Sequence, residues 1–327
     1  MRAKAERPRV AFYCVSSGLY FLGAVAMLNS LRLVGHGEPV FLLDHGLTPE
    51  QRDLLAPQAT LLAAPSDAPP YLQKTVAPLS RPADVMVLID ADVIVTRPLT
   101  ELIAEASRGR VVGFRNNLDR FNPKWEELLD LGPVRRQPYL SSGLVFLGGA
   151  TGTEVLRVMD DRQSRVEFDL TYVRENVADY PFLLLDQDIL NAILASRVEP
   201  ERIVSLATRL APNQPYPELR LLDEDELRCA YGDGVEPYVL HHLVREPPWS
   251  KPMRRDPYSQ LLARLLLGDD VAVKLPETEL PLSMRSGLLA GAQRARHRLG
   301  WRFRDLVPES IVARIDARRM RRGAWRL

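Results

Sequence analysis

Two aspartates interrupt a strongly apolar stretch of the sequence, residues 85–95 (VMVLIDADVIV). Asp90 and Asp92 follow an apolar run that predicts a buried strand, so both should emerge at its carboxyl-terminal end. Open α/β sheets bind their ligands at that edge. Neighbouring carboxylates there need a cation, and a hard divalent ion would bind them together with the phosphates of a nucleotide diphosphate. A turn stabilised by aspartate is the alternative interpretation.

Two further Asp-x-Asp pairs occur, so the pattern alone is weak evidence. Asp223 and Asp225 lie in LLDEDEL, whose acidic density is typical of a solvated helix start, and we expect no chemical role for them. Asp186 and Asp188 lie in FLLLDQDILNAIL, an apolar run that continues at helical spacing.

Histidines follow another short strand-like segment, Tyr-Val-Leu. A neutral imidazole of His241 or His242 could complete a metal shell, and a histidine satisfied at a strand end is the alternative. The sequence has no glycine-rich phosphate loop of the Gly-x-x-x-x-Gly-Lys or Gly-x-Gly-x-x-Gly type. Metal and basic side chains would therefore have to hold the phosphates.

Alternating strands and helices must position these side chains. The apolar patterns predict strands over residues 10–15, 39–43, 85–89, 110–114, 139–146 and 238–240. They predict helices over residues 20–34, 71–79 and 100–106, and one that begins at residue 48. This alternation predicts an α/β fold with parallel strands and right-handed crossovers.

Composition describes a globular chain with one unusual segment. The 327 residues are 46% hydrophobic and 26% charged, enough for a large domain with an appendage. The formal net charge is +1, yet residues 283–327 hold twelve arginines and three acidic residues, a net of about +9. Cys14 and Cys229 lack metal-ligand spacing, which favours a reducing cytoplasm. The short apolar run near the N-terminus is typical of neither a signal-peptide core nor a membrane span, so we expect no secretion signal.

Four segments, in this order, resemble the nucleotide-sugar glycosyltransferases of family 8: VLIDADVIV, YLSSGLVFL, LLLDQDILNAIL and VLHHLVREPPW. The match spans residues 9–249, about three quarters of the chain, and DQDILN is its most specific part. The resemblance implies a GT-A type, Rossmann-like single domain over residues 8–256 with a mixed, mainly parallel central sheet. Residues 257–327 would form a helical, arginine-rich C-terminal extension.

The resemblance also implies a metal site. Asp90, Asp92 and His241 would hold Mn²⁺ or Mg²⁺ on a UDP-sugar, and Asp90 would also lie close to the ribose or sugar. His241 is preferred to His242 because it lies eight residues before Trp249, as the family histidine does.

Catalytic residues come from the second Asp-x-Asp segment. Asp186 and Gln187 match the family's acceptor-side and donor-sugar-side residues beneath the anomeric carbon. Gln187 is a poor nucleophile, so the resemblance favours front-face transfer, in which the departing diphosphate helps deprotonate the acceptor hydroxyl. Asp188 would cap the helix that follows.

The sequence matches the family's donor-binding positions less completely. Lys74 matches a basic position that contacts the donor, with an exposed helix lysine as the alternative. Ser16 and Ser17 stand where the family holds uracil and ribose. Ser141-Ser142-Gly143 replaces the family's common Asn-x-Gly, which leaves the donor sugar open.

A second departure lies in the histidine loop. Val244 and Pro247 replace the family's glycine and lysine, so the usual lysine contact to the diphosphate is absent. Arg245 or Lys251 would substitute for it from nearby positions.

The C-terminal segment, residues 288–327, mixes arginines with residues such as Trp301, Phe303 and Trp325. This amphipathic composition favours attachment to an anionic membrane surface. A solvated helix pair and nucleic-acid binding are the alternatives, although no recognised nucleic-acid motif accompanies the charge.

Together these features predict a metal-dependent, retaining glycosyltransferase that moves a hexose from a UDP-sugar to a saccharide or glycolipid acceptor. We expect a cytoplasmic protein, peripheral on the inner face of the cell membrane, that binds no nucleic acid. The alternatives are a non-catalytic sugar-binding module with the same fold and a nucleotidyltransferase, which would normally show a glycine-rich basic loop near its N-terminus.

Overall fold

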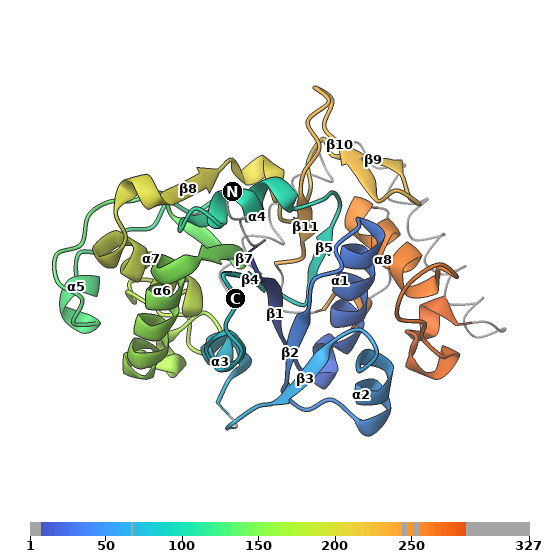
Figure 1. Ribbon diagram of the computed structural model, residues 1–327, viewed down its shortest axis with the longest axis horizontal. Helices are drawn as coiled ribbons and strands as arrows, with labels where there is room; N and C mark the ends of the chain where they lie inside the picture. Colours follow the sequence, from blue (N-terminus) through green and yellow to red (C-terminus); the bar gives the residue numbers. More distant parts are fainter. Residues whose placement is uncertain (1–7, 67, 244–246, 251–255, 286–327) are drawn as a thin grey trace, which may run out of the picture.

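A seven-stranded sheet forms the centre of the molecule in this computed structural model, which describes residues 8–66, 68–243, 247–250 and 256–285 (Figure 1). Its strands, in spatial order, are β3 (Thr60–Ala63), β2 (Val40–Asp44), β1 (Val10–Ser16), β4 (Val85–Ile89), β7 (Leu140–Gly148), β6 (Val111–Arg115) and β8 (Ile203–Leu206). β7 is antiparallel to both of its neighbours, and the remaining pairs are parallel. The mixed, mainly parallel sheet that the family resemblance implies is confirmed, whereas the antiparallel β7 departs from the parallel order that the alternation of strands and helices predicts.

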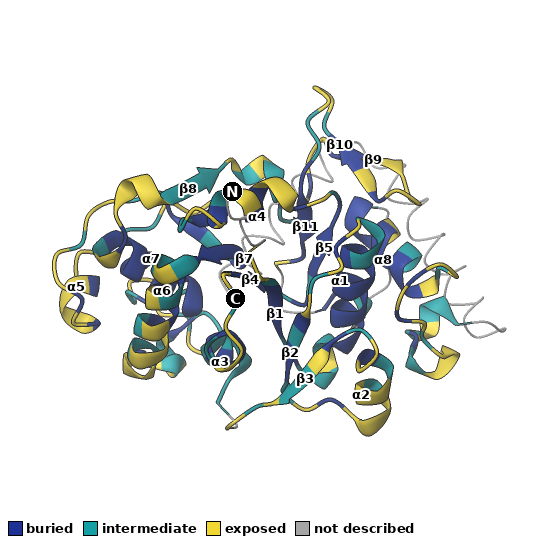
Figure 2. Cartoon of the chain, viewed as in Figure 1, coloured by how far each residue is buried: buried dark blue, intermediate teal, exposed yellow. Residues whose placement is uncertain are grey.

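Helices cover both faces of this sheet (Figure 2). One face is covered by α1 (Phe21–Leu33), α2 (Pro49–Leu55) and α4 (Thr100–Ala106), and α8 (Pro257–Leu267) extends the same core cluster by packing against α1. The other packs against α3 (Val76–Ser80), α5 (Trp125–Leu128), α6 (Gly149–Arg162) and α7 (Asp186–Arg197). The alternation of side chains along β4 explains why both faces are covered, because successive side chains of a strand point to opposite faces of the sheet. Val85, Val87 and Ile89 lie in the core cluster on the first face, and Met86 and Leu88 lie in the cluster on the second.

Two small antiparallel pairs complete the described strands: β5 (Val93–Val95) with β11 (Val239–His241), and β9 (Arg220–Asp223) with β10 (Arg228–Ala230). The expected helix start at Asp223 and Asp225 is wrong, because this acidic segment is the turn between β9 and β10. The carboxylate of Asp223 accepts hydrogen bonds from the backbone N–H groups of Asp225, at 2.9 Å, and Glu226, at 3.0 Å. Such bonds stabilise a tight turn as readily as a helix start.

The helix expected over residues 71–79 is interrupted. A 3₁₀ helix (Pro70–Gln73) and α3 stand in its place, with Lys74 between them. Pro78 has no backbone N–H to bond to the carbonyl of Lys74, so one continuous α-helix cannot form there. The apolar patterns also missed β3, β5, α6, β8 and the β9–β10 hairpin.

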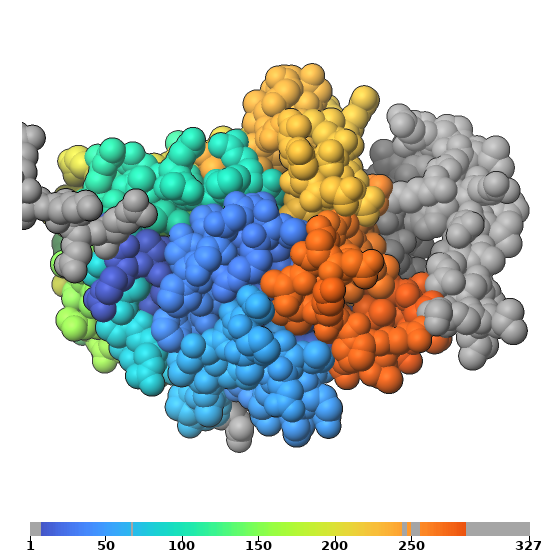
Figure 3. Space-filling view, turned by 45° about the vertical axis from the view of Figure 1, so that its right-hand side comes forward, coloured from blue at the N-terminus to red at the C-terminus, as the bar shows by residue number. Residues whose placement is uncertain are grey.

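The C-terminal described residues pack against the first helix. Asn29 of α1 is buried, and its side chain donates to the carbonyls of Leu265 and Val273 and accepts from the N–H of Val273. Figure 3 shows this orange segment against the blue N-terminal residues. The boundary at residue 256 stays a prediction, but residues 256–285 contribute to the core of the predicted domain. Within the described part of the chain, no helix is both long and apolar enough to span a bilayer.

Candidate active site

Two strand ends and a turn bring Asp90, Asp92 and His241 together. β4 ends at Ile89 and β5 begins at Val93, so both aspartates lie in the turn between these strands. β5 pairs with β11, and Val93 lies opposite His241 in the register. One ligand atom from each of the three side chains lies within 4.8 Å of the other two.

Gly143 of β7 makes room for the imidazole of His241. The Asp90 N–H donates to the Gly143 carbonyl at 2.9 Å, which places this glycine beside the aspartate turn. A Cβ atom at residue 143 would lie 2.3 Å from His241 Cε1. A side chain at this position would therefore displace the ring from the carboxylates.

The donor set fits a divalent metal ion. His241 Nε2 lies 3.1 Å from Asp92 Oδ1 and 4.0 Å from Asp90 Oδ2. This nitrogen is buried and has no well-aligned hydrogen bond among the described residues. Two carboxylates and an imidazole nitrogen are ligands that Mn²⁺ and related ions accept in proteins.

His242 points elsewhere. Its Nδ1 contacts the side-chain amide of Gln214, and its ring packs against Tyr258 with the centroids 5.2 Å apart. The structure therefore places His241, and not His242, with the two aspartates.

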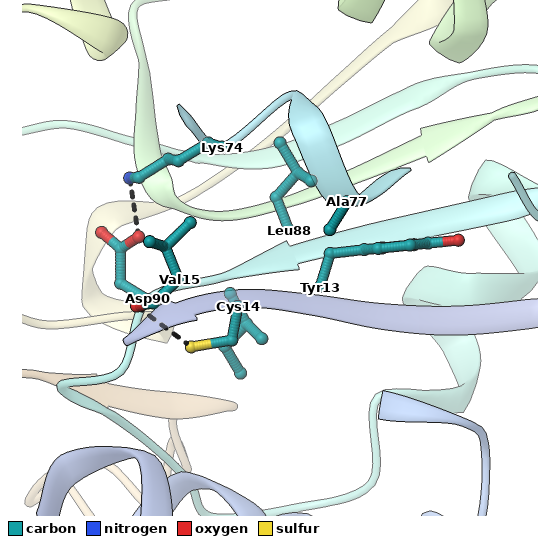
Figure 4. Close-up of a pocket in the computed structure, with 8 residues that line it drawn as sticks. Tyr13, Cys14, Val15, Lys74, Ala77, Leu88 and Asp90 are labelled. Atoms are coloured by element: carbon teal, nitrogen blue, oxygen red, sulfur yellow. Dashed lines mark hydrogen bonds and ion pairs between the residues drawn. The ribbon is translucent and has the colours of Figure 1, made fainter. Parts of the chain in front are cut away.

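Lys74 connects the aspartate turn to α7. Its Nζ lies 2.6 Å from Asp90 Oδ1 and 2.9 Å from Asp186 Oδ2. The lysine side chain is 12% exposed and that of Asp186 is 7% exposed, so the alternative of an exposed helix lysine is wrong. Figure 4 shows Lys74 directed at Asp90 beside a small cavity that Cys14 and Val15 of β1 also line.

Burial and charge set the protonation of this cluster. Burial raises the pKa of Asp90. Burial acts on Asp92 in the same direction, but the adjacent His241, together with His242 and Lys74, outweighs it and lowers the pKa of Asp92. Burial alone would lower the pKa values of His241 and Lys74, and the neighbouring carboxylates raise both instead. The carboxylates thus favour positive charge at the position where a metal ion would lie.

Gln187 lies beside the Ser141-Ser142-Gly143 segment of β7. Its Oε1 accepts from the Ser142 N–H at 3.2 Å and from Asn116 Nδ2 at 3.3 Å. Its Nε2 donates to the Tyr139 hydroxyl at 3.2 Å. Both ends of the amide are therefore held by protein groups.

Asp188 is fully buried and has a structural role. One carboxylate oxygen accepts from Arg120 Nε at 3.0 Å and from the Tyr139 hydroxyl at 2.6 Å. The other accepts from the Leu184 N–H at 2.7 Å, which joins the chain before α7 to the first turn of the helix. Asp188 lies inside α7, and Leu185 occupies the N-cap position with no side-chain cap hydrogen bond, so the expected helix cap is wrong, whereas a structural role for Asp188 fits these contacts.

The residue before α7 is strained. Leu185 has a φ of 50°, a backbone conformation that residues other than glycine rarely adopt. Its fully buried side chain lies in the core cluster on this face of the sheet, which holds it in place. Strain of this kind, about 1–3 kcal/mol, often lies beside functional groups, and Asp186 and Gln187 follow directly.

The match of Ser16 and Ser17 to the uracil and ribose site stays a prediction. Ser16 ends β1 and is buried, with its hydroxyl directed at the Ser17 carbonyl, 3.3 Å away. Arg245 and Lys251 lie outside the described residues.

Sequence patterns missed several groups that shape this site. Gly23 of α1 lets the helix approach the aspartate turn, because a Cβ atom there would lie 2.3 Å from the Ala91 carbonyl oxygen and 2.5 Å from Trp249 Cη2. A lone glycine in an apolar helix was a signal for this close approach. Tyr216 and Tyr258 also contact the site, and nothing local in the sequence marks them.

No protein-family model and no curated protein sequence matches this chain. Solved structures do. The galactosyltransferase LgtC, in complex with donor and acceptor sugar analogs, aligns with 82% of this chain and 98% of its own, with a TM-score of 0.50 and 14% identity. The bifunctional glycosyltransferase WbbM aligns with 83% of this chain, with a TM-score of 0.51 and 14% identity, and this chain spans 51% of its length.

These alignments define the class of fold. The chain has the mixed α/β, GT-A type fold of glycosyltransferases, with helices on both faces of the central sheet. The resemblance predicted from the four sequence segments is confirmed at the level of the fold.

Proposed function

We propose that this chain is a metal-dependent, retaining glycosyltransferase that moves a hexose from a UDP-sugar to a hydroxyl group of a saccharide or glycolipid. The observation that carries the proposal is the Asp90, Asp92 and His241 cluster at the edge of the sheet of a glycosyltransferase fold. Ligands of open α/β sheets bind at the carboxyl ends of the strands, and β4 ends directly before Asp90.

Each side chain has a role in this proposal. Asp90, Asp92 and His241 would hold Mn²⁺ or Mg²⁺, which when bound would stabilise negative charge on the departing diphosphate. Lys74 adds a buried positive charge between Asp90 and Asp186. Arg245 and Lys251 would supply further cations to the diphosphate, in place of the lysine that the family has in this loop.

Retention of configuration would follow from front-face attack. Gln187 is a poor nucleophile, and its amide is already bonded to Ser142, Asn116 and Tyr139. It would therefore orient the donor sugar rather than form a covalent intermediate. Asp186, fixed by Lys74, would orient hydroxyl groups on the acceptor side.

Ligand-induced stabilisation tests the donor and metal together. Melting temperatures would be measured with UDP-, GDP- and dTDP-sugars, each with and without Mn²⁺. A ligand at 100 times its dissociation constant stabilises the native state by about 2.7 kcal/mol, so a UDP-sugar with Mn²⁺ should raise the melting temperature by roughly 5 °C. No shift with any UDP-sugar would contradict the proposal.

A sugar-binding module without activity is the alternative from another class. It would bind the same ligands but release no UDP. Mn²⁺-dependent release of UDP from a UDP-sugar, absent in an Asp92→Asn variant, would support the enzyme.

We also propose that the arginine-rich C-terminal segment attaches the protein to the inner face of the cell membrane. The segment lies outside the described residues, and its charge and aromatic residues support the proposal. Flotation with anionic vesicles should recover the full chain and fail for a chain that ends at residue 285. Equal recovery of both chains would contradict membrane attachment through this segment.

A further inference from the structure

We infer that Tyr216 and Tyr258 are positioning residues for the metal site, because each tyrosine hydroxyl holds the backbone carbonyl of a proposed ligand residue. The inference rests on the proposed function, which makes Asp92 and His241 metal ligands. It extends the site to two segments that have no ligand of their own.

The contacts are direct. The Tyr258 hydroxyl donates to the Asp92 carbonyl at 2.9 Å, and the Tyr216 hydroxyl donates to the His241 carbonyl at 2.6 Å. Both tyrosines are buried: Tyr258 is 0% exposed and Tyr216 is 3% exposed. Their rings stack with the centroids 6.3 Å apart and the planes 3° from parallel, so the two hydroxyl groups are held as a unit.

These hydrogen bonds fix the peptide planes that follow the two ligand residues. Fixing a peptide plane limits rotation about the backbone bond next to it, which in turn limits where the side chain of that residue can point. The Asp92 carbonyl also accepts from the His242 N–H at 3.2 Å, which ties the aspartate turn to the end of β11. These contacts therefore hold the main chain of Asp92 and that of His241 in fixed relative positions.

The supporting segments are themselves anchored. Tyr258 lies in the first turn of α8, and Asn29 of α1 binds the carbonyl of Leu265 at the other end of that helix. Tyr216 has a φ of 58°, a strained conformation for a residue with a side chain. Its buried, stacked ring holds this conformation, and strain is frequent beside functional groups. Tyr258, which lies after the predicted domain boundary at residue 256, thus supports the proposed metal site.

Conservative variants of the full-length chain test the inference. Tyr216→Phe and Tyr258→Phe keep the stacked rings and remove only the hydroxyl groups. Tyr238→Phe is the matched control, since its hydroxyl donates to a Glu101 carboxylate oxygen at 2.7 Å and holds no ligand carbonyl. Mn²⁺ binding would be measured by titration calorimetry with Mn²⁺ alone and with saturating UDP, well below the melting temperature of each variant.

We expect Tyr216→Phe and Tyr258→Phe each to weaken Mn²⁺ binding about tenfold or more, as loss of groups that support metal ligands commonly does. The Mn²⁺ affinity of Tyr238→Phe should stay within about twofold of that of the unchanged protein, because the Tyr238 hydroxyl does not contact a ligand residue. A purely structural role would instead lower the melting temperatures of all three metal-free variants and leave Mn²⁺ affinity unchanged, which would overturn the inference.

The outcomes separate the inference from the proposed function. If the unchanged protein binds no Mn²⁺ in either titration, the metal site is wrong and the inference falls with it. If the unchanged protein and both variants bind Mn²⁺ equally, the positioning role is wrong and the metal site stands. Because Tyr216 and Tyr258 lie in different segments, either variant decides the result when the other does not fold.

Discussion

The same Asp-x-Asp pattern is used in two different ways in this molecule. In the turn after β4, both Asp90 and Asp92 contribute to one cluster with His241. On α7 the pattern divides, because Asp186 contacts Lys74 and its neighbour Asp188 is buried in a structural network. Residues two apart on a helix differ by about 200° around its axis, so their side chains must point apart.

In these two pairs the backbone, and not the motif, determines what each aspartate does. In a turn between two strands, residues on either side of the tip can converge on one ligand. At the start of a helix, only one of two such residues can face the same site. Substitutions in the two pairs should therefore separate loss of activity from loss of stability.

The largest effect is expected at the aspartate turn. Asp92→Asn removes a charged metal ligand, so Mn²⁺-dependent release of UDP should fall on the order of 10³-fold. The melting temperature of the metal-free protein should change little, because the substitution removes both the attraction between Asp92 and His241 and the repulsion between Asp92 and Asp90. Turnover that survives in this variant would remove Asp92 from the metal site.

Gly143 offers the next largest effect, and it leaves the first pair of aspartates intact. Gly143→Ala would place a Cβ atom 2.3 Å from His241 Cε1, so the imidazole must move away from both carboxylates. We expect a loss of activity of about 10²-fold with weaker Mn²⁺ binding. Gly232→Ala is the matched control, because a Cβ atom there meets no atom of the described structure within 4 Å. Equal activity of the two variants would contradict the packing argument.

The sequence predicted where some residues of this candidate site lie. The run before Asp90 is fully apolar and bounded, so the strand and the position of the aspartates at its end followed from the pattern alone. The four segments that resemble the glycosyltransferase family added Asp186 and His241 to the predicted site residues. Short, partly exposed strands such as β8 lack a clear alternation, and their burial shows why they were missed.

Long-range contacts explain the rest of what could not be predicted. Lys74 meets Asp186 only after β1, β4 and α7 have packed around one sheet edge, and no local pattern encodes that meeting. The hydroxyl groups of Tyr216 and Tyr258 reach the site through pairing and helix packing that only the complete fold defines.

The second pair of aspartates should separate stability from activity. Asp188→Asn leaves Arg120 and Tyr139 without their carboxylate, which should lower the free energy of unfolding by about 2–3 kcal/mol. Asp186→Asn should cost less stability, since Lys74 keeps its contact with Asp90, and should lower UDP release more strongly. Urea unfolding and UDP release would be measured on both variants. Equal stability losses would contradict the division of roles along α7.

The smallest effect is expected at the third pair, in the β9–β10 turn. Asp225 is 87% exposed, and its partner Arg264 also contacts Asp270 at 2.7 Å, so Asp225→Ala removes one of two exposed ion-pair partners. The Arg264 side chain is 10% exposed but keeps Asp270 as a partner, and an ion pair with so exposed a carboxylate contributes little to stability. We therefore expect the melting temperature to change by no more than ~1 °C with UDP release unchanged. Asp188 is fully buried and Asp225 is 87% exposed. A loss of stability in Asp225→Ala as large as that of Asp188→Asn would therefore mean that burial does not decide how much an aspartate of this pattern contributes to stability.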